Sequence, residues 1–170
     1  MLTSGHIAAS YILAQSVKSI GIPLTFNEVF GIIIAGNIID LDFFIGFITG
    51  KTGEAHHHSI THTPIGILVI WLGIWLIFKP PSMLSFLILA ALFIHLILDD
   101  IGHWTYRAHL FTSRVYPQIN WFYPFTKYHH YELIMSNIQV LKHYVFKTTP
   151  IFILEVVLVI IAGGLFLVSK

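Results

Sequence analysis

Two ionisable residues interrupt the sequence where it is otherwise most apolar. His95 and Asp99 lie at the end of an apolar run that begins at Ser82 and reads SMLSFLILAALFIHLIL up to Leu98. Residues four apart share one face of a helix, so the imidazole and the carboxylate can bind a single ion. A charged group in hydrocarbon costs several kcal/mol, and ionisable residues at such positions are usually functional. The run therefore predicts a membrane-embedded helix that carries a binding site.

The overall composition is that of a membrane protein. Of 170 residues, 56% are hydrophobic, 15% are aromatic and only 10% are charged, and the mean hydropathy is +0.80. Such a chain is too apolar for an ordinary soluble domain. We predict one membrane-embedded domain, residues 1–170, with an all-α fold: a polytopic bundle of about four to five transmembrane helices in the inner membrane. The lipid bilayer is the expected partner.

Charge and cysteine content narrow the possible functions. The formal net charge is +1, and the lysines and arginines are scattered along the chain, so the continuous basic surface of a nucleic-acid-binding protein is not expected. The chain has no cysteine, which excludes disulfides and thiolate metal ligands. Histidine, aspartate and glutamate remain as strong metal ligands, and the chain has 11 histidines. The histidines are therefore the main candidates for a functional site.

Helix-stop and loop residues divide the chain into apolar segments. Gly21 and Pro23 end the first segment, and Lys79-Pro80-Pro81 ends the third. The second segment has Asn27 as a plausible N-cap. Before the last segment, an aromatic and basic stretch from Thr105 to Thr149 is typical of an interfacial segment rather than of a free linker. The apolar parts of the expected helices are residues 4–20, 27–42, 63–78, 82–98 and 150–169, and the fourth helix continues through Asp99.

If these helices cross the bilayer in alternating directions, polar residues from separate segments fall on the same side of the membrane. The alternation places His6, the Asp40–Asp42 pair, the histidines of residues 56–62 and the His95–Asp99 pair at one membrane surface. Composition alone does not require this agreement, so it indicates one shared site. The same side also carries most of the lysines and arginines, and the positive-inside rule then favours a cytoplasmic orientation.

The acidic candidates also have simpler structural explanations. Asp40 and Asp42 are two residues apart, about 200 degrees around a helix, so both face one centre only if the helix ends or unwinds there. One of them then serves as a ligand while the other orients a ligating histidine. Alternatively, both mark a helix end at the headgroups. His95 and Asp99 either bind a metal or form a buried hydrogen bond that stabilises helix packing.

The loop histidines and the first histidine of the chain each allow two interpretations. The stretch HHHSITH begins at His56 and ends at His62. We favour His57 and His62 as ligands over their neighbours, although a loop histidine run can also be solvated. His62 stands at the start of an apolar segment, which would hold its side chain in place. His6 is equally compatible with a ligand and with a structural histidine.

Several short motifs occur in series, namely Ser4-Gly5-His6, Asp40-Leu41-Asp42, His57-His58-Ser59-Ile60-Thr61-His62, His95-Leu96-Ile97-Leu98-Asp99 and Tyr123-Pro124-Phe125. In this order they resemble the small membrane-bound metal-dependent hydrolases of bacteria and archaea. The resemblance extends over roughly residues 4 to 126. Ile39 replaces the proline of that family and His58-Ser59 replaces its Arg-Gly pair, but the presumed ligands are kept.

The resemblance implies a metal centre held by His6, Asp40, Asp42, His57, His62, His95 and Asp99. The same order of residues is similar to a reduced form of the zinc-dependent phospholipase C and single-strand nuclease site, in which Asp99 would bridge two ions. It implies one or two Zn²⁺ ions, or Mn²⁺, and a metal-activated water that attacks a phosphoester or ester bond of a lipid-like substrate. Asp42 and His62 are the candidate catalytic residues.

Three other functions fit parts of the sequence. A metal or proton transporter needs ligands that continue across the bilayer, but residues 63–78, the apolar segment that follows His62, contain none. The last apolar segment has only Glu155, which we expect near the interface or paired with a neighbour. A di-iron lipid oxidase needs repeated histidine boxes, which are absent. A non-catalytic membrane scaffold with a metal site is the remaining alternative.

Overall fold

The computed structural model describes residues 2–42, 60–110, 117–126, 142, 145 and 149–169. Within these residues the regular structure is helical, without strands, and the predicted all-α fold is confirmed. The elements are α1 (Thr3–Ser19), α2 (Phe26–Asn37), η1 (Ile38–Asp40), η3 (Ile60–His62), α4 (Pro64–Phe78), α5 (Ser82–Arg107) and α7 (Thr149–Val168).

Side-chain caps set where two of the helices begin. The Thr25 side chain accepts a hydrogen bond from the Glu28 backbone N–H, and the Glu28 carboxylate accepts one from the Thr25 backbone N–H. This reciprocal capping box starts α2 at Phe26, so the prediction of Asn27 as the N-cap was wrong. Thr63 caps α4 in a similar way, by accepting a hydrogen bond from the Gly66 N–H.

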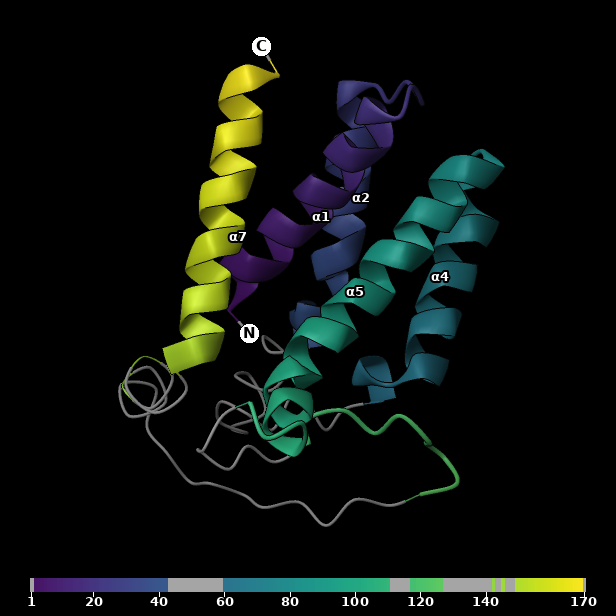
Figure 1. Cartoon of the computed structure of the whole chain (residues 1–170). Coiled ribbons are helices and arrows are strands. Elements are labelled where there is room, and N and C mark those ends of the chain that lie inside the picture. The colour runs from purple at the N-terminus through teal and green to yellow at the C-terminus, as the bar shows by residue number, and fades with distance from the viewer. Residues whose placement is uncertain are drawn as a thin grey trace.

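Helix α5 lies at the centre of the bundle and is longer than the apolar run with which it begins. It continues past Leu98 to Arg107, since Gly102 alone does not break it. It contacts α1, α2 and α4, while α7 packs against α1. Figure 1 shows α7 and α4 on opposite sides of the bundle, with the lower end of α5 close to the N-terminal end of α1.

Two apolar clusters hold the helices together around α5. One cluster joins α1 and α2 to α5 through buried side chains such as Ala14, Ile32 and Leu87. The other joins α2 and α4 to an adjacent face of α5, and includes Ile67 and Ile119. Because both clusters use α5, its position fixes the ends of the neighbouring helices relative to one another.

Helices α5 and α7 are long and apolar enough to cross a membrane, with best-window mean hydropathies of 2.2 and 3.0. Only 6% of the α7 window is buried within the protein, against 50% for α5. A helix that is apolar all round and faces outward suits a lipid environment. Helix α4 is apolar but shorter. The expected number of about four to five spans therefore stays a prediction.

Candidate metal centre

A cluster of histidines and carboxylates is built around His95 and Asp99 of α5. His95 and Asp99 are one helical turn apart, and both are buried, at 1% and 7% exposure. The His95 Nε2 atom lies 3.2 Å from Asp99 Oδ2. The apolar face of α5 thus presents an imidazole and a carboxylate to the neighbouring helices inside the protein.

The first turns of α1 bring His6 onto this pair. The His6 ring stacks on the His95 ring, with centroids 3.8 Å apart and planes within 14° of parallel. His6 Nε2 lies 3.0 Å from Asp99 Oδ1. His6 is 1% exposed, so α1 carries a polar side chain into the protein where an apolar one would pack more simply.

Asp40 joins the cluster because the helix before it tightens. Helix α2 ends at Asn37 and continues as the 3-10 turn Ile38–Asp40. This change of geometry places Asp40 Oδ1 3.2 Å from His95 Nε2. The helix thus changes its geometry at the aspartates, as the sequence analysis required for both of them to lie near one centre.

A second 3-10 turn, η3, supplies His62. Its Nε2 atom lies 3.7 Å from Asp40 Oδ1 and 3.8 Å from Asp99 Oδ2. Its Nδ1 atom lies 3.0 Å from Asp42 Oδ2, and the Thr61 hydroxyl donates a hydrogen bond to the same carboxylate. Of the two aspartates, Asp40 thus faces the cluster, whereas Asp42 stands behind His62.

Two of the imidazoles are oriented from behind by oxygen acceptors. His95 Nδ1 lies 2.8 Å from the Gly36 carbonyl oxygen, which can only accept, so Nδ1 carries the proton and donates it. The Asp42 carboxylate has the same relation to His62 Nδ1. Metal-binding histidines usually have such a partner, because it fixes the tautomer and directs Nε2 to the ion.

The donor atoms form two overlapping groups whose members all lie within 4.8 Å of one another: His6, Asp40 and His95, and His62, His95 and Asp99. Zinc binds imidazole nitrogen and carboxylate oxygen at about 2 Å, so donors to one ion are separated by roughly 3 to 4 Å. The individual separations above, from 3.0 to 3.8 Å, match this spacing. The donor set of imidazoles and carboxylates suits Zn²⁺ or Mn²⁺.

Hydrogen bonding within the cluster is incomplete. Although carboxylate oxygens lie within 3.2 Å, His6 Nε2 and His95 Nε2 have no hydrogen-bond partner of acceptable geometry among the described residues. Buried polar atoms are almost always paired, and each exception needs an explanation. A bound cation is one such explanation, because imidazole nitrogens and carboxylates around an ion point at the ion rather than at one another.

The sequence matches the model of a known protein family over its whole length. A model described as YdjM inner membrane protein matches residues 1–170. The chain belongs to the YdjM inner membrane protein family. It is therefore a membrane protein, as its composition predicted. No curated protein and no solved structure matches it.

Electrostatics favour the ionised form of Asp40. Burial alone raises the pKa of this carboxyl group, but its contacts with His62 and His95 outweigh burial and hold the pKa below its usual range. Burial lowers the pKa of His62, but Asp40 and Asp42 outweigh it, and the pKa of His62 is raised. Asp40, which contacts both His62 and His95, is thus a carboxylate, the form that binds metal ions.

The structure brings together most of the predicted site residues. His6, Asp40, His62, His95 and Asp99 meet in one cluster, and Asp42 contacts it through His62. His57 lies outside the described residues. The roles of these residues as ligands, and of Asp42 and His62 in catalysis, stay predictions.

Glu155 and Gly36 complete the surroundings of the cluster. Glu155, buried at 3% exposure, accepts hydrogen bonds from the Leu2 N–H and the Ser4 hydroxyl, which confirms the expected pairing with a neighbour. It ties α7 to the first turn of α1, just before His6. The role of the Gly36 carbonyl group was not predicted, and no sequence signal identifies it, because every residue has a carbonyl group.

Proposed function

We propose that this YdjM-family protein is a multi-pass membrane hydrolase with a zinc-type centre bound by His6, Asp40, His62, His95 and Asp99. The observation that carries the proposal is the convergence of these donors. They come from α1, η1, η3 and α5, and they form two groups of three that share His95, each with its donor atoms within 4.8 Å of one another. Helices α5 and α7 are the spans that the proposal places in the bilayer.

The arrangement is better explained by a bound ion than by an ion-pair network alone. Buried ion pairs are weak contributors to stability, because the cost of desolvating both charges offsets their attraction. Here the Nε2 atoms of His6 and His95 are buried, at hydrogen-bond distance from carboxylates, yet their geometry does not give hydrogen bonds in the described part of the chain. Ligation accounts for this geometry, whereas packing alone does not.

The residues around the cluster prepare the imidazoles for binding. Gly36 accepts the Nδ1 proton of His95, and Asp42 accepts the Nδ1 proton of His62, so both rings present Nε2. A bound divalent ion would supply a water of lowered pKa and would polarise a phosphoryl or acyl oxygen. In this account Asp42 is a positioning residue for His62, and the Thr61 hydroxyl in turn positions Asp42.

The position of the cluster along α5 favours an amphiphilic substrate. The segment from Ser82 to Leu98 is apolar, and the cluster lies where this segment gives way to Asp99 and Asp100. In a helix that spans the bilayer, this is the depth at which lipid ester and phosphoester groups lie. We therefore propose a phosphoester or ester bond of a lipid-like molecule as the bond that is cleaved.

The test is hydrolysis by protein of defined metal content. Protein in a non-ionic detergent is treated with a chelator, reloaded with Zn²⁺ or Mn²⁺ and incubated with a mixed phospholipid extract, and the products are identified by mass spectrometry. We expect reloaded protein to release headgroup or acyl products, chelated protein to release none, and His95→Gln to be inactive. His109→Asn is the matched control, since His109 is exposed, outside the cluster and at positive φ, which asparagine tolerates.

The variant Asp42→Asn tests whether Asp42 orients His62 or binds the metal ion itself. Loss of an orienting partner usually reduces metal affinity or activity by about 10- to 100-fold, whereas loss of a ligand abolishes binding. We expect Asp42→Asn to retain weaker zinc binding and reduced turnover. Zinc-loaded wild-type protein without turnover on any ester would refute the hydrolase and favour a membrane scaffold with a metal site.

A further inference from the structure

A second polar site lies beyond the cluster, at the C-terminal end of α5. A pocket of about 650 Å³ opens there between the helix end and the segment 117–126. Its walls carry Arg107, His103 and Trp104 from the helix end and Trp121 from the segment, with Asp100 at the centre. This volume is within the range of about 300–1,000 Å³ that is usual for small-molecule sites.

The pocket is built by specific contacts rather than left by loose packing. Asp100 is 1% exposed and accepts two hydrogen bonds, from the Gln118 backbone N–H and from Trp121 Nε1, each at 2.8 Å. Between these two donors, Ile119 is fully buried in the apolar core. Asp100 therefore fixes the far wall of the pocket against α5, and the pocket exists before any ligand arrives.

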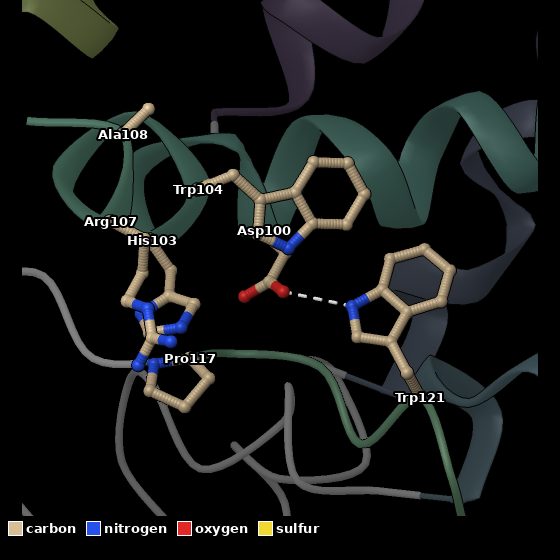
Figure 2. A pocket seen from close by; sticks show the side chains of 7 residues that line it. All are labelled: Asp100, His103, Trp104, Arg107, Ala108, Pro117 and Trp121. Atoms are coloured by element: carbon tan, nitrogen blue, oxygen red, sulfur yellow. Dashed lines mark hydrogen bonds between the residues drawn. The ribbon is translucent and has the colours of Figure 1, made fainter. Parts of the chain in front are cut away.

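Aromatic rings form one side of the pocket. The indoles of Trp104 and Trp121 lie with centroids 5.3 Å apart at an angle of 34°, as a tilted pair. Indole faces attract cations through their negative quadrupole, and tryptophan does so most strongly among the aromatic side chains. The Asp100 carboxyl group lies beside the pair and presents its oxygens there as hydrogen-bond acceptors (Figure 2). This part of the pocket is suited to an ammonium group.

The opposite side of the pocket is suited to an anion. Arg107 is exposed and always charged, and its planar guanidinium binds phosphate oxygens in a bidentate manner. His103, one turn before it on α5, adds an imidazole on the same wall. Figure 2 shows these two side chains together on the side of the Asp100 carboxylate away from Trp121. The two ends of one pocket are thus suited to groups of opposite charge.

The position of the pocket relative to the bilayer indicates where a ligand with both an anionic and a cationic group would come from. It begins where the apolar part of α5 ends, and tryptophan and arginine at the end of a span are typical of the headgroup region. Zwitterionic phospholipids present a phosphate and an ammonium group, separated by two carbons, at this depth. A soluble phosphate would satisfy Arg107 but would leave the aromatic and acidic side without a partner.

We propose that the pocket formed by Asp100, His103, Trp104, Arg107 and Trp121 binds the headgroup of a zwitterionic phospholipid, with the phosphate at Arg107 and the ammonium group at the tryptophan pair. This lipid site is separate from the proposed metal centre, and it holds whether or not the protein is a hydrolase. It would fix the depth and rotation of α5 in the membrane.

The tryptophans themselves report on binding. The chain has four tryptophans, so a Trp71→Phe/Trp75→Phe background leaves only the two that line the pocket. Protein in dodecyl maltoside is titrated with dihexanoyl phosphatidylethanolamine, and in parallel with dihexanoyl phosphatidylglycerol and with inorganic phosphate. We expect a saturable change in fluorescence with the ethanolamine lipid, and at least tenfold weaker binding of the other two ligands.

Substitutions on the same background test the charge at the anion end. Arg107→Gln should weaken binding of the ethanolamine lipid at least tenfold, and because Arg107 is exposed at a helix end, the fold should be kept, as circular dichroism checks. Lys18→Gln removes one positive charge from an exposed position at the end of α1 and should not change binding. Equal binding of the glycerol lipid or of inorganic phosphate would overturn zwitterion recognition. The absence of saturable binding, or equal losses in both variants, would overturn the site.

Discussion

Gly66 is the position where a single methyl group should disturb the metal centre without touching a ligand. A Cβ atom there would overlap the Ile60 carbonyl group and would lie 3.0 Å from the Thr61 Cα. These are backbone atoms of η3, the turn that carries His62, and they cannot move aside as a flexible side chain would. Gly73, in the same helix, has no atom within 4 Å of the equivalent position among the described residues. The two glycines therefore form a matched pair.

The two substitutions should change the free energy of unfolding in opposite directions. Replacing glycine by alanine inside a helix stabilises it by about 0.5–1 kcal/mol, and Gly73→Ala should show this gain. Overpacking costs about 1–3 kcal/mol, so Gly66→Ala should be destabilised by a net ~1–2 kcal/mol. For a chain of this size, 1 kcal/mol corresponds to a shift in Tm of about 2–4 °C.

Thermal unfolding followed by circular dichroism in detergent measures both shifts, and elemental analysis measures zinc. We expect Gly66→Ala to unfold at lower temperature and to lose zinc, and Gly73→Ala to unfold at higher temperature with zinc retained. Equal Tm shifts of the same sign in the two variants would refute the argument from η3 packing.

Three further predictions concern residues outside the cluster. Thr25→Ala should reduce the free energy of unfolding by about 1 kcal/mol, as is typical when a capping side chain is removed, which thermal unfolding measures. The hydrogen bonds from the backbone and side chain of Thr25 lower the pKa of Glu28 from its ordinary 4.5. Their stabilising contribution is therefore complete above that value and is lost as the pH falls through the lowered pKa. Between pH 6 and pH 3, Glu28→Gln should lose less stability than the wild type, and equal losses in the two proteins would contradict the assignment. Glu155→Ala leaves the Leu2 N–H and the Ser4 hydroxyl without their acceptor, at a cost of about 1–3 kcal/mol, while Glu155→Gln, which keeps a carbonyl acceptor, should lose less in the same assay.

The sequence predicted the part of the site that helix geometry alone determines. His95 and Asp99 share a face because they are four residues apart, and the structure places them side by side. The order of the apolar segments further predicted that His6 and His62 would meet this pair. That inference needed only alternating helices, since such an arrangement returns every second helix end to the same side.

Other features depend on tertiary packing and were not predictable. The residue at which α2 ends and tightens into η1 decides whether Asp40 or Asp42 faces the cluster. A helix one residue longer or shorter would turn both side chains to other directions. The stacking of His6 on His95 depends on how α1 crosses α5. The end of α5 at Arg107 was not predicted either, because a polar stretch stops a membrane span without stopping a helix.

The caps of the helices show how a local signal can be misread. Asn27 is a good N-cap residue, yet Thr25 has the glutamate three residues later that completes a capping box, and the box determines the start of α2. The pattern Thr25-x-x-Glu28 was present in the sequence and would have given the correct boundary. By contrast, the role of Asp100 in fixing Trp121 joins residues from separate segments and had no local signal.

The central claim is that the cluster binds a metal ion, and elemental analysis of the purified protein tests it most directly. Wild-type protein, His95→Gln, Asp99→Asn and the His109→Asn control are purified in detergent without added chelator, and zinc, manganese and iron are quantified per chain. We predict one or two zinc or manganese ions in the wild type and the control, with loss in both cluster variants. A wild-type protein without metal, or cluster variants with full metal content, would contradict the account.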